Sequence, residues 1–354
     1  MQNRIWTYEE YCRPDFVKML RALRLDVNFT KGEGDTLYYT NDGGEEVAVL
    51  DVAGGMGSTL LGHNNPVVNK TLVQCLEQGD PMHTQGAVRE SAGRLAERLN
   101  SLYPGKEKRI CIFTNTGTES VETALKHAEM NRMKRFLAIG KELKAHHKKM
   151  RAYFCNNTGY TLPAKYRDKG FDALLNDVLM QGLILEQLHP VVVSTRGAFH
   201  GKTTTSLSVT GNKMYREAFA RLSGIQTRFI DFNSAEQLEA ALEDNYFEIN
   251  KIVVKDGVVS LVPEKHLNVT AFIMEPIQGE GGIHVATREF IEQIIALRQK
   301  HGFEWVVDEI QSGMGRTGSF FALERYSIDY DAADYVLLSK ALGGAVSKRS
   351  VALS

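Results

Sequence analysis

The sequence predicts an α/β protein whose central sheet is mostly parallel. Short apolar runs alternate with segments of helical periodicity such as TREFIEQIIALRQKHG, and strands that alternate with helices form parallel sheets covered on both faces. Polar or charged residues also follow the runs closely, and ligands of such folds bind beyond the carboxyl ends of the strands. The runs are RICIF, PVVVST, TRFIDF, VTAFIMEP, FEWVVDE and ADYVLLSK.

Residues 1–70 are predicted to form a small N-terminal segment with helix and strand. A helix is expected over residues 8–24, interrupted near Pro14, because proline ends or kinks a helix. The runs TLYYT and VAVLDV flank turn residues 41–44, a pattern typical of a β-hairpin. Two amphipathic helices are expected next, over residues 67–101.

Residues 71–354 are predicted to form a large α/β domain, interrupted by an atypical basic insertion at about residues 130–190. From Lys126 to Lys169 there are 12 Lys or Arg and 3 Asp or Glu, so 12 − 3 gives +9. A solvated helix face is the expected explanation, and the alternative is a docking surface for an acidic partner or a phosphorylated substrate. The adjacent histidines 146–147 are expected on that face, since neighbouring helical residues point in different directions. No metal site is predicted.

The composition is ordinary for a soluble globular protein. The formal net charge of −1 gives no general attraction to nucleic acid or to an anionic membrane. No apolar run reaches the roughly 18 residues of a membrane-spanning helix, and the first ten residues lack the apolar core of a secretory signal. The four cysteines are scattered, without a C-x-x-C pair, which indicates reduced thiols and a cytoplasmic location.

The first chemistry-bearing motif is Asn115-Thr116-Gly117-Thr118, which follows RICIF and precedes a helix expected to begin at Glu119. Free N–H groups at a helix N-terminus bind anions. Gly117 would allow close approach, and the flanking threonines would supply hydroxyl groups. The alternative is an ordinary helix cap at Thr118.

A second motif lies in STRGAFHGKTTT, where GKTT resembles part of a nucleotide-binding P-loop. That loop has four residues between its glycines, whereas three separate Gly197 from Gly201. Because VVDE resembles a magnesium-binding strand, an ATPase stays open as an alternative. Phe199 and His200 suit a flat ligand instead, with Phe199 stacked on its ring; the alternative is that Phe199 is a core residue.

Charged residues end three of the apolar runs, namely Glu275, Asp308 and Lys340. A charge at the end of a buried strand is costly unless an opposite charge or a hydrogen-bond partner meets it. A structural ion pair would explain one such residue. Three of them in one sheet indicate a functional site.

Together these motifs resemble those of the class III aminotransferases, pyridoxal 5'-phosphate (PLP) enzymes that include ornithine, acetylornithine and 4-aminobutyrate aminotransferases. DVAGGMGSTLLGHNNPVV also resembles the family's glycine-rich segment, and the match covers most of residues 35–125 and 190–354. The resemblance implies fold type I, PLP as cofactor and a homodimer with active sites at its interface. The ordered motifs are NTGTESVETALK, FHGKTTTSLSVTG, MEPIQGEGG, VVDEIQSGMGRTGSFFALE and LLSKALGG.

The resemblance also implies a role for each site residue. Lys340 would form a Schiff base with the cofactor aldehyde and then act as general acid and base. Asp308 would pair with the pyridinium nitrogen, which makes the ring an electron sink. The other cofactor-binding residues would be Thr116, Gly117 and Thr118 at the phosphate, Phe199 and His200 at the ring, Gln311 at the ring hydroxyl, and Glu275 beside the cofactor.

The implied reaction transfers an amino group between an amine or amino acid, ω-amino substrates included, and a 2-oxo acid. The alternatives are a mutase, racemase or decarboxylase of the same family, or a truncated homologue without catalysis. Family members continue well beyond the lysine, so the sequence is expected to be C-terminally truncated and to lack the C-terminal small domain. The basic insertion leaves a substrate bound to a carrier protein as a further option.

Overall fold

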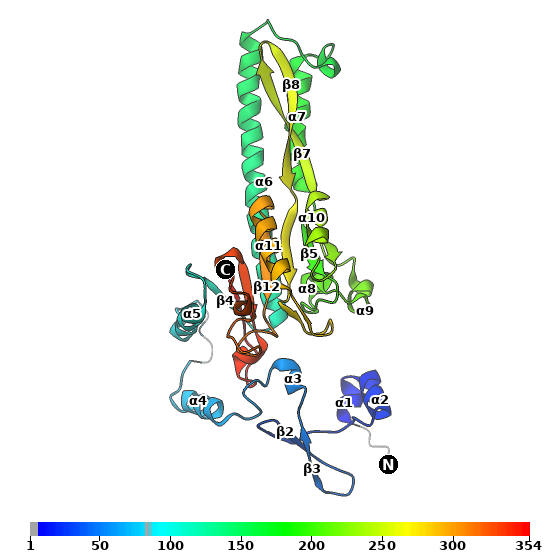
Figure 1. Ribbon diagram of the computed structural model, residues 1–354, viewed down its shortest axis with the longest axis vertical. Coiled ribbons are helices and arrows are strands. Elements are labelled where there is room, and N and C mark those ends of the chain that lie inside the picture. The colour runs from blue at the N-terminus through cyan, green and yellow to red at the C-terminus, as the bar shows by residue number, and fades with distance from the viewer. Residues whose placement is uncertain (1–5, 82–83, 85) are drawn as a thin grey trace. The chain divides into compact units, whose positions relative to one another are not determined.

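The computed structural model describes residues 6–81, 84 and 86–354, so the first five residues of the N-terminal stretch lie outside it (Figure 1). The chain divides into two compact units. The first unit contains the residues up to Arg89 together with Lys340–Lys348, and the second contains Glu90–Ser339 together with Arg349–Ser354. The domains predicted at residues 1–70 and 71–354 stay predictions.

The first unit combines short helices with a small antiparallel sheet. Pro14 occupies the first position of the second helix, so the predicted break is confirmed. The predicted hairpin is also confirmed: β2 pairs with β3, and Asn41 Oδ1 accepts the backbone N–H groups of Gly43 and Glu45 at 2.9 and 3.0 Å. The elements are α1 (Thr7–Tyr11), α2 (Pro14–Ala22), β1 (Lys31–Glu33), β2 (Thr36–Thr40), β3 (Glu46–Leu50), α3 (Gly54–Gly57), α4 (Pro66–Glu77) and the 3₁₀ helix η5 (Lys340–Gly343).

A seven-stranded sheet forms the centre of the second unit, in the order β4-β14-β13-β12-β9-β5-β6. Only β14 is antiparallel to its neighbours, and the pairs from β13 to β6 are parallel. The mostly parallel α/β fold is therefore confirmed, and all six predicted runs are strands of this sheet. Their bounds are β4 (Cys111–Thr114), β5 (Val191–Thr195), β6 (Gln226–Ile230), β9 (Val269–Met274), β12 (Glu304–Asp308), β13 (Tyr335–Leu338) and β14 (Ser350–Leu353).

Helices cover the sheet because its central strands are apolar on both faces. Val121 and Ala124 of α6 (Gly117–Asn156) share one buried cluster with Ile273 and Val306 of the strands, and each fully buried aliphatic side chain contributes about 1.5–3 kcal/mol. No helix among the described residues is long and apolar enough to cross a bilayer. The smaller elements are α5 (Glu90–Leu102), α8 (Thr204–Val209), α9 (Lys213–Arg216), η2 (Glu217–Phe219), α10 (Ala235–Glu243), β10 (Ile277–Gln278), β11 (His284–Val285), α11 (Arg288–His301), η3 (Ala322–Tyr326) and η4 (Tyr330–Ala332).

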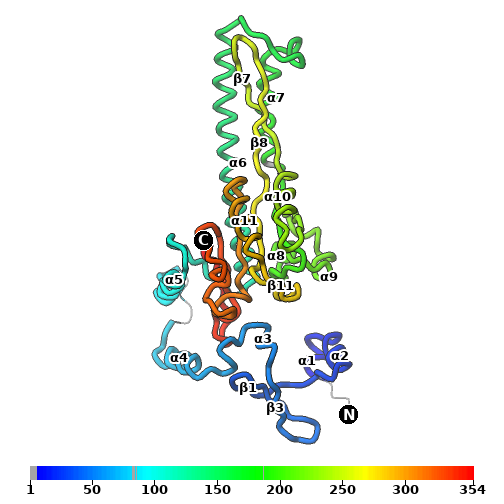
Figure 2. The backbone as a smooth tube through the Cα atoms, viewed as in Figure 1, coloured from blue at the N-terminus to red at the C-terminus, as the bar shows by residue number. Residues whose placement is uncertain are grey.

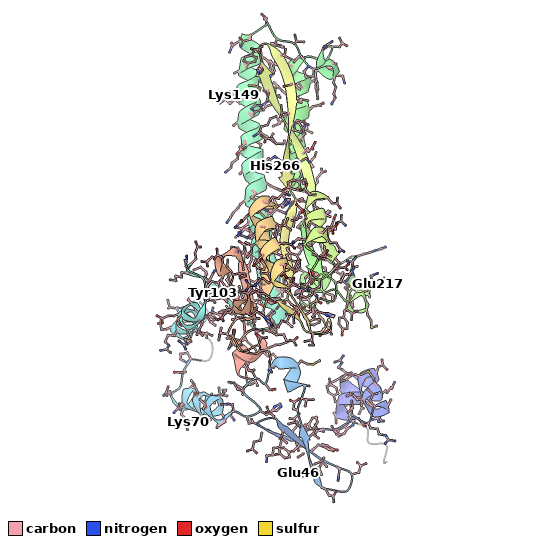
Figure 3. All side chains as sticks on the ribbon, viewed as in Figure 1. Glu46, Lys70, Tyr103, Lys149, Glu217 and His266 are labelled. Atoms are coloured by element: carbon pink, nitrogen blue, oxygen red, sulfur yellow. The ribbon has the colours of Figure 1, made fainter. Side chains whose placement is uncertain are left out.

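The outer part of α6 continues beyond the sheet, with α7 (Gly170–Gln187) and a hairpin of β7 (Tyr246–Lys255) and β8 (Val258–Leu267) alongside (Figures 1 and 2). We call residues 130–187 and 246–267 the extension. It has its own apolar core, and the short helix η1 (Ala164–Tyr166) connects its two long helices. Figure 3 labels Lys149 on its helix α6 and His266 on its hairpin. The core includes Phe136, Leu143, Leu174, Val178 and Ile252.

The hairpin was not predicted; it shares one apolar core with residues 130–187, and the insertion predicted at about residues 130–190 stays a prediction. The sequence signal for the hairpin is the dipeptide Asp256-Gly257 between two valine-rich runs. Both residues have positive φ, 50° and 75°, as a two-residue hairpin turn requires. The hairpin also corrects the prediction for the two histidines. His146 and His147 are partly buried instead of exposed, and burial lowers the pKa of His146.

Candidate active site

The predicted site residues of the second unit follow the carboxyl ends of parallel strands. Thr116 to Thr118 follow β4, Phe199 and His200 follow β5, Glu275 follows β9, and Asp308 ends β12. Since these strands run in one direction, their carboxyl ends meet at one edge of the sheet, the place where α/β proteins bind ligands.

A buried pair lies at the centre of this edge. His200 Nδ1 and Asp308 Oδ2 are 2.8 Å apart, and the two residues are 2% and 3% exposed. Asp308 Oδ1 also accepts the backbone N–H of Ile310 at 3.0 Å. The imidazole Nε2 is buried and has no hydrogen-bond partner among the described residues. Sequence reasoning named both residues but did not predict that they pair.

Glu275 lies beside this pair and is buried as well. Its carboxylate accepts the backbone N–H of Phe199 at 3.0 Å and that of Gly279 at 3.2 Å. Loss of solvation raises the pKa of Glu275 to about 7; His200 opposes this rise and Asp308 adds to it. Glu275 therefore fixes two loops of the site and is poised to change protonation near neutral pH.

Gln311 lies against the loop that follows Glu275. A Cβ atom at Gly279 would overlap Gln311 Oε1, so glycine at that position makes room for the amide. Gly117, the first residue of α6, leaves room in the same way, since a Cβ there would lie 2.9 Å from Ile310 Cδ1. The loop after Asp308 is thus packed between the loop of Gly279 and the N-terminus of α6.

The N-terminus of α6 differs from the expectation. The helix begins at Gly117 with Thr116 as its N-cap, not at Glu119 with Thr118 as its cap. The Glu119 carboxylate accepts the backbone N–H groups of Asn115 and Thr116 at 2.8 and 2.9 Å. The error arose because Gly117 was assigned to the loop, whereas the capping box of Thr116 and Glu119 already starts the helix there.

Thr118 is therefore not the N-cap of α6, and it instead connects α6 to the first turn of α8. Its hydroxyl lies 2.6 Å from Ser206 Oγ and 2.9 Å from Thr203 Oγ1. Glu122 Oε1, one turn further along α6, accepts from Thr203 Oγ1, Thr205 N and Ser206 N at 2.6, 2.8 and 3.0 Å. Burial acts to raise the pKa of Glu122, but these hydrogen bonds outweigh it and lower the pKa.

Glu122 was missed by sequence reasoning, and its position bears on the P-loop alternative. The GKTT segment leads into α8, whose first N–H groups bind the Glu122 carboxylate. A P-loop offers those groups to nucleotide phosphates. A carboxylate in their place argues against nucleotide binding at this segment.

Phe199 is half-buried instead of a core residue. Its ring packs edge-on against Tyr215, with centroids 6.3 Å apart. The Lys202 ammonium lies 4.1 Å from the Tyr215 ring centroid and 5.7 Å from that of Phe199. One face of the site thus carries an aromatic pair with a cation beside it.

Lys340 directly follows Ser339, which comes after β13, and it begins η5. Its φ is 37°, in the left-handed region, where a residue other than glycine costs about 1–3 kcal/mol and such strain is often found at functional sites. Lys340 groups with the first unit, so its approach to the His200–Asp308 pair stays a prediction.

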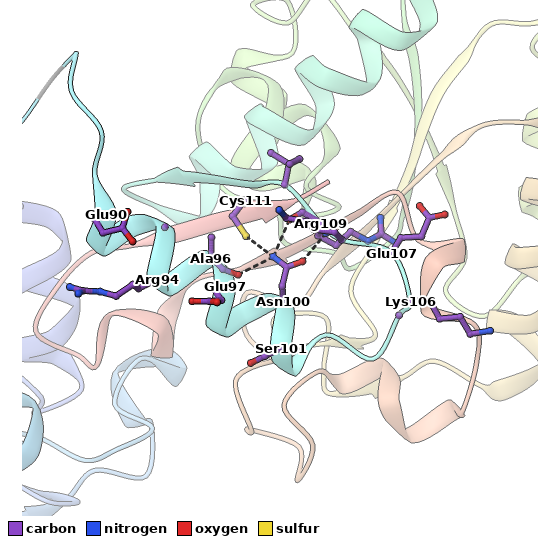
Figure 4. Close-up of a pocket in the computed structure, with 14 residues that line it drawn as sticks. Glu90, Arg94, Ala96, Glu97, Asn100, Ser101, Lys106, Glu107, Arg109 and Cys111 are labelled. Atoms are coloured by element: carbon purple, nitrogen blue, oxygen red, sulfur yellow. Dashed lines mark hydrogen bonds between the residues drawn. The ribbon is translucent and has the colours of Figure 1, made fainter.

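A separate pocket of about 760 Å³ lies between α5 and residues 105–111 (Figure 4). Asn100 holds its two walls together: its Nδ2 donates to the Arg109 carbonyl at 3.0 Å, and its Oδ1 accepts the Arg109 N–H at 2.7 Å. The lining contains charges of both signs and none of the predicted site residues.

The fold is that of a mostly parallel α/β protein with its candidate site residues at one edge of the sheet, and the comparisons identify the family. The model of the family "Aminotransferase class-III" matches residues 21–352. The chain therefore belongs to the class III aminotransferases, a family of PLP-dependent transaminases. This confirms the predicted family and fold type I.

Solved structures of low sequence identity share the fold. Ornithine aminotransferase from Toxoplasma gondii ME49 is 21% identical, with a TM-score of 0.63 over 99% of this chain and 67% of that one. N-acetylornithine aminotransferase from Stenotrophomonas maltophilia K279a is 24% identical, with a TM-score of 0.57 over 96% and 64%. A transaminase from the marine bacterium Virgibacillus is 19% identical, with a TM-score of 0.60 over 92% and 58%. The chain thus spans about two thirds or less of their lengths.

Proposed function

We propose that this chain carries the PLP-binding centre of an aminotransferase, which moves an amino group between an amine or amino acid, ω-amino substrates included, and a 2-oxo acid. The observation that carries the proposal is the buried His200–Asp308 pair beside Glu275. Removing these ionisable side chains from water costs free energy, which an opposite charge nearby can offset. A cationic ring nitrogen would supply that charge.

The residues at the sheet edge fit PLP. When bound, PLP supplies an aromatic ring that withdraws electrons from the substrate carbon, so that this carbon can lose a proton. Asp308 would hold the proton on the ring nitrogen; each of its oxygens has one hydrogen-bond partner, His200 or Ile310, and so keeps a lone pair for this contact. His200 would orient Asp308. Phe199 would cover one ring face, and Gln311 would donate to the ring hydroxyl.

The phosphate would bind at the N-terminus of α6. The first N–H groups of a helix have no partner within it, and the positive end of the helix dipole favours an anion. Gly117 and Thr118 would donate their N–H groups there, with the Thr116 hydroxyl beside them. Glu275 would lie near the cofactor and, with its pKa raised to about 7, would respond to the charge of an incoming substrate.

Lys340 would be the second catalytic residue, beside Asp308. Its amine would hold the cofactor covalently and, once displaced by the substrate amine, would take a proton from the substrate carbon and return it to the cofactor carbon. The small-molecule amino donor and the 2-oxo acid acceptor would be its substrates. We further propose a homodimer in the cytoplasm, with a carrier-bound amino donor as an additional substrate class.

The test is an amino-transfer assay of the purified chain with PLP. Isotopically labelled amino donors are supplied with a 2-oxo acid, and labelled amino-acid product is measured by mass spectrometry. The proposal predicts transfer that disappears in Lys340→Ala. Carbon dioxide release, racemisation or migration of the amino group within one molecule, without transfer, would overturn the aminotransferase assignment in favour of the related PLP reactions.

A further inference from the structure

The outward face of α6 carries a continuous row of exposed residues along the extension. They recur every three or four positions, so they lie on one face of the helix. The row spans about 30 Å at 1.5 Å per residue. We call it the basic stripe; it consists of Met130, Met133, Lys134, Leu137, Lys141, Lys144, Lys148 and Arg151, all exposed.

The stripe faces away from the protein's own core. The α6 residues that pack in the core of the extension are Phe136, Leu143, Met150 and Phe154. These residues follow one another at intervals of seven or four positions and lie on the opposite side of the helix. Packing within the extension therefore does not explain the composition of the stripe.

The cations of the stripe are nearly unpaired. Among the described residues, none of its four lysines forms an ion pair, and Arg151 meets Asp172 only at 3.8 Å, with both side chains more than 60% exposed. The extension does contain carboxylates, but they pair elsewhere, as in Lys165–Asp177 and Lys251–Glu264 at 2.8 and 2.7 Å. A solvated surface of balanced charge would carry both acidic and basic side chains, whereas the charged residues of the stripe are all basic.

The stripe also exposes three large apolar side chains at its inner end. Met130, Met133 and Leu137 are 44%, 36% and 61% exposed. An exposed apolar patch with polar residues around it is typical of a surface that meets another protein, and methionine is enriched at such surfaces. These apolar side chains would make no favourable contact with the phosphate backbone of a nucleic acid. The stripe also has no aromatic ring on which a base could stack.

We propose that the basic stripe binds an acidic amphipathic helix of a partner protein. A helix with carboxylates three or four residues apart matches the spacing of Lys141, Lys144 and Lys148. Apolar residues on the same helix would cover Met130, Met133 and Leu137. The proposal does not depend on the aminotransferase assignment, since the stripe contains no residue of the candidate active site.

The probe is a fluorescent synthetic helix of about six turns, with Leu at every third or fourth position and Glu elsewhere, titrated with the purified chain at low salt. The test variant is Lys141→Glu/Lys144→Glu/Lys148→Glu. The control, Lys169→Glu/Lys255→Glu/Lys265→Glu, makes the same charge change at exposed positions of the extension outside the stripe. The stripe variant is expected to bind at least about tenfold more weakly and the control within about twofold of the parent.

A second variant tests the apolar end. Met130→Ser/Leu137→Ser is expected to weaken the amphipathic helix about fivefold while binding of polyglutamate stays unchanged. Since all substituted side chains are exposed, thermal unfolding of every variant is expected to match the parent. Equal weakening in the stripe and control variants, or tighter binding of duplex DNA than of the helix, would overturn the proposal.

Discussion

His200 Nδ1 lies 2.8 Å from Asp308 Oδ2, and both side chains are buried at the carboxyl edge of the parallel sheet. The two residues come from different strand ends, 108 positions apart in the sequence. The pair orients one carboxylate with a hydrogen bond on each oxygen. In the proposed function this carboxylate would face a protonated ring nitrogen, which is stabilised by an opposite charge held in a fixed position.

Substitution Asp308→Asn is expected to preserve the fold and remove the catalytic charge. The amide oxygen can still accept the Ile310 N–H, so stability should stay within about 1 kcal/mol. Activity should fall at least about hundredfold, which corresponds to about 2.7 kcal/mol of barrier, because a neutral amide would not hold the proton on the ring nitrogen. Urea denaturation and the amino-transfer assay measure the two effects. An active Asn variant would contradict the assigned role.

Substitution His200→Phe is expected to weaken PLP binding about tenfold to hundredfold, because a hydrogen bond to a charged group contributes about 1.5–3 kcal/mol. Fluorescence titration with PLP measures the affinity. His200→Asn, which offers an amide donor, is the control and should recover part of the affinity. If both variants bind PLP like the parent, His200 does not orient Asp308.

Glu122 is expected to connect the phosphate end of the site to the loop of Phe199. Glu122→Ala removes three hydrogen bonds and should lower stability by about 1–3 kcal/mol, whereas Glu122→Gln keeps an oxygen acceptor and should cost less. Comparing PLP with pyridoxal, which lacks the phosphate, isolates the phosphate contribution. The Ala variant should lose affinity for PLP and keep that for pyridoxal; equal losses would argue for a general structural role.

Glu309 is expected to make stability fall as pH rises. Burial raises its pKa to about 8 from 4.5, although the N–H groups of Ala322 and Leu323 oppose the rise. Between these pH values the folded chain binds a proton that the unfolded chain has lost, so stability declines from about pH 4.5 upward, and the loss is complete above about pH 8. Glu275 and Glu304, with pKa values raised to about 7, act in the same direction.

Denaturation curves at several pH values test this effect. The decline should be smaller in Glu309→Gln than in the parent, because the amide does not titrate. Identical pH dependence of the two proteins would show that the Glu309 carboxyl is not held protonated in the folded state.

The sequence was most informative where a local pattern decides the structure. Apolar runs followed by charged residues predicted the sheet and the positions of Glu275 and Asp308. Contacts between distant segments were not predictable in this way. The His200–Asp308 pair and the Glu122 contacts depend on which strands become neighbours, and the hairpin at residues 246–267 was missed although its Asp256-Gly257 turn is a local signal.

The most direct test of the central claim is where PLP attaches to this chain. The purified chain is incubated with PLP, reduced with borohydride, digested and analysed by mass spectrometry. The account predicts that the reduced cofactor is found on the peptide containing Lys340 and is lost in Lys340→Ala, while the Lys202→Ala control keeps it. Attachment to other lysines with Lys340 unmodified would contradict it.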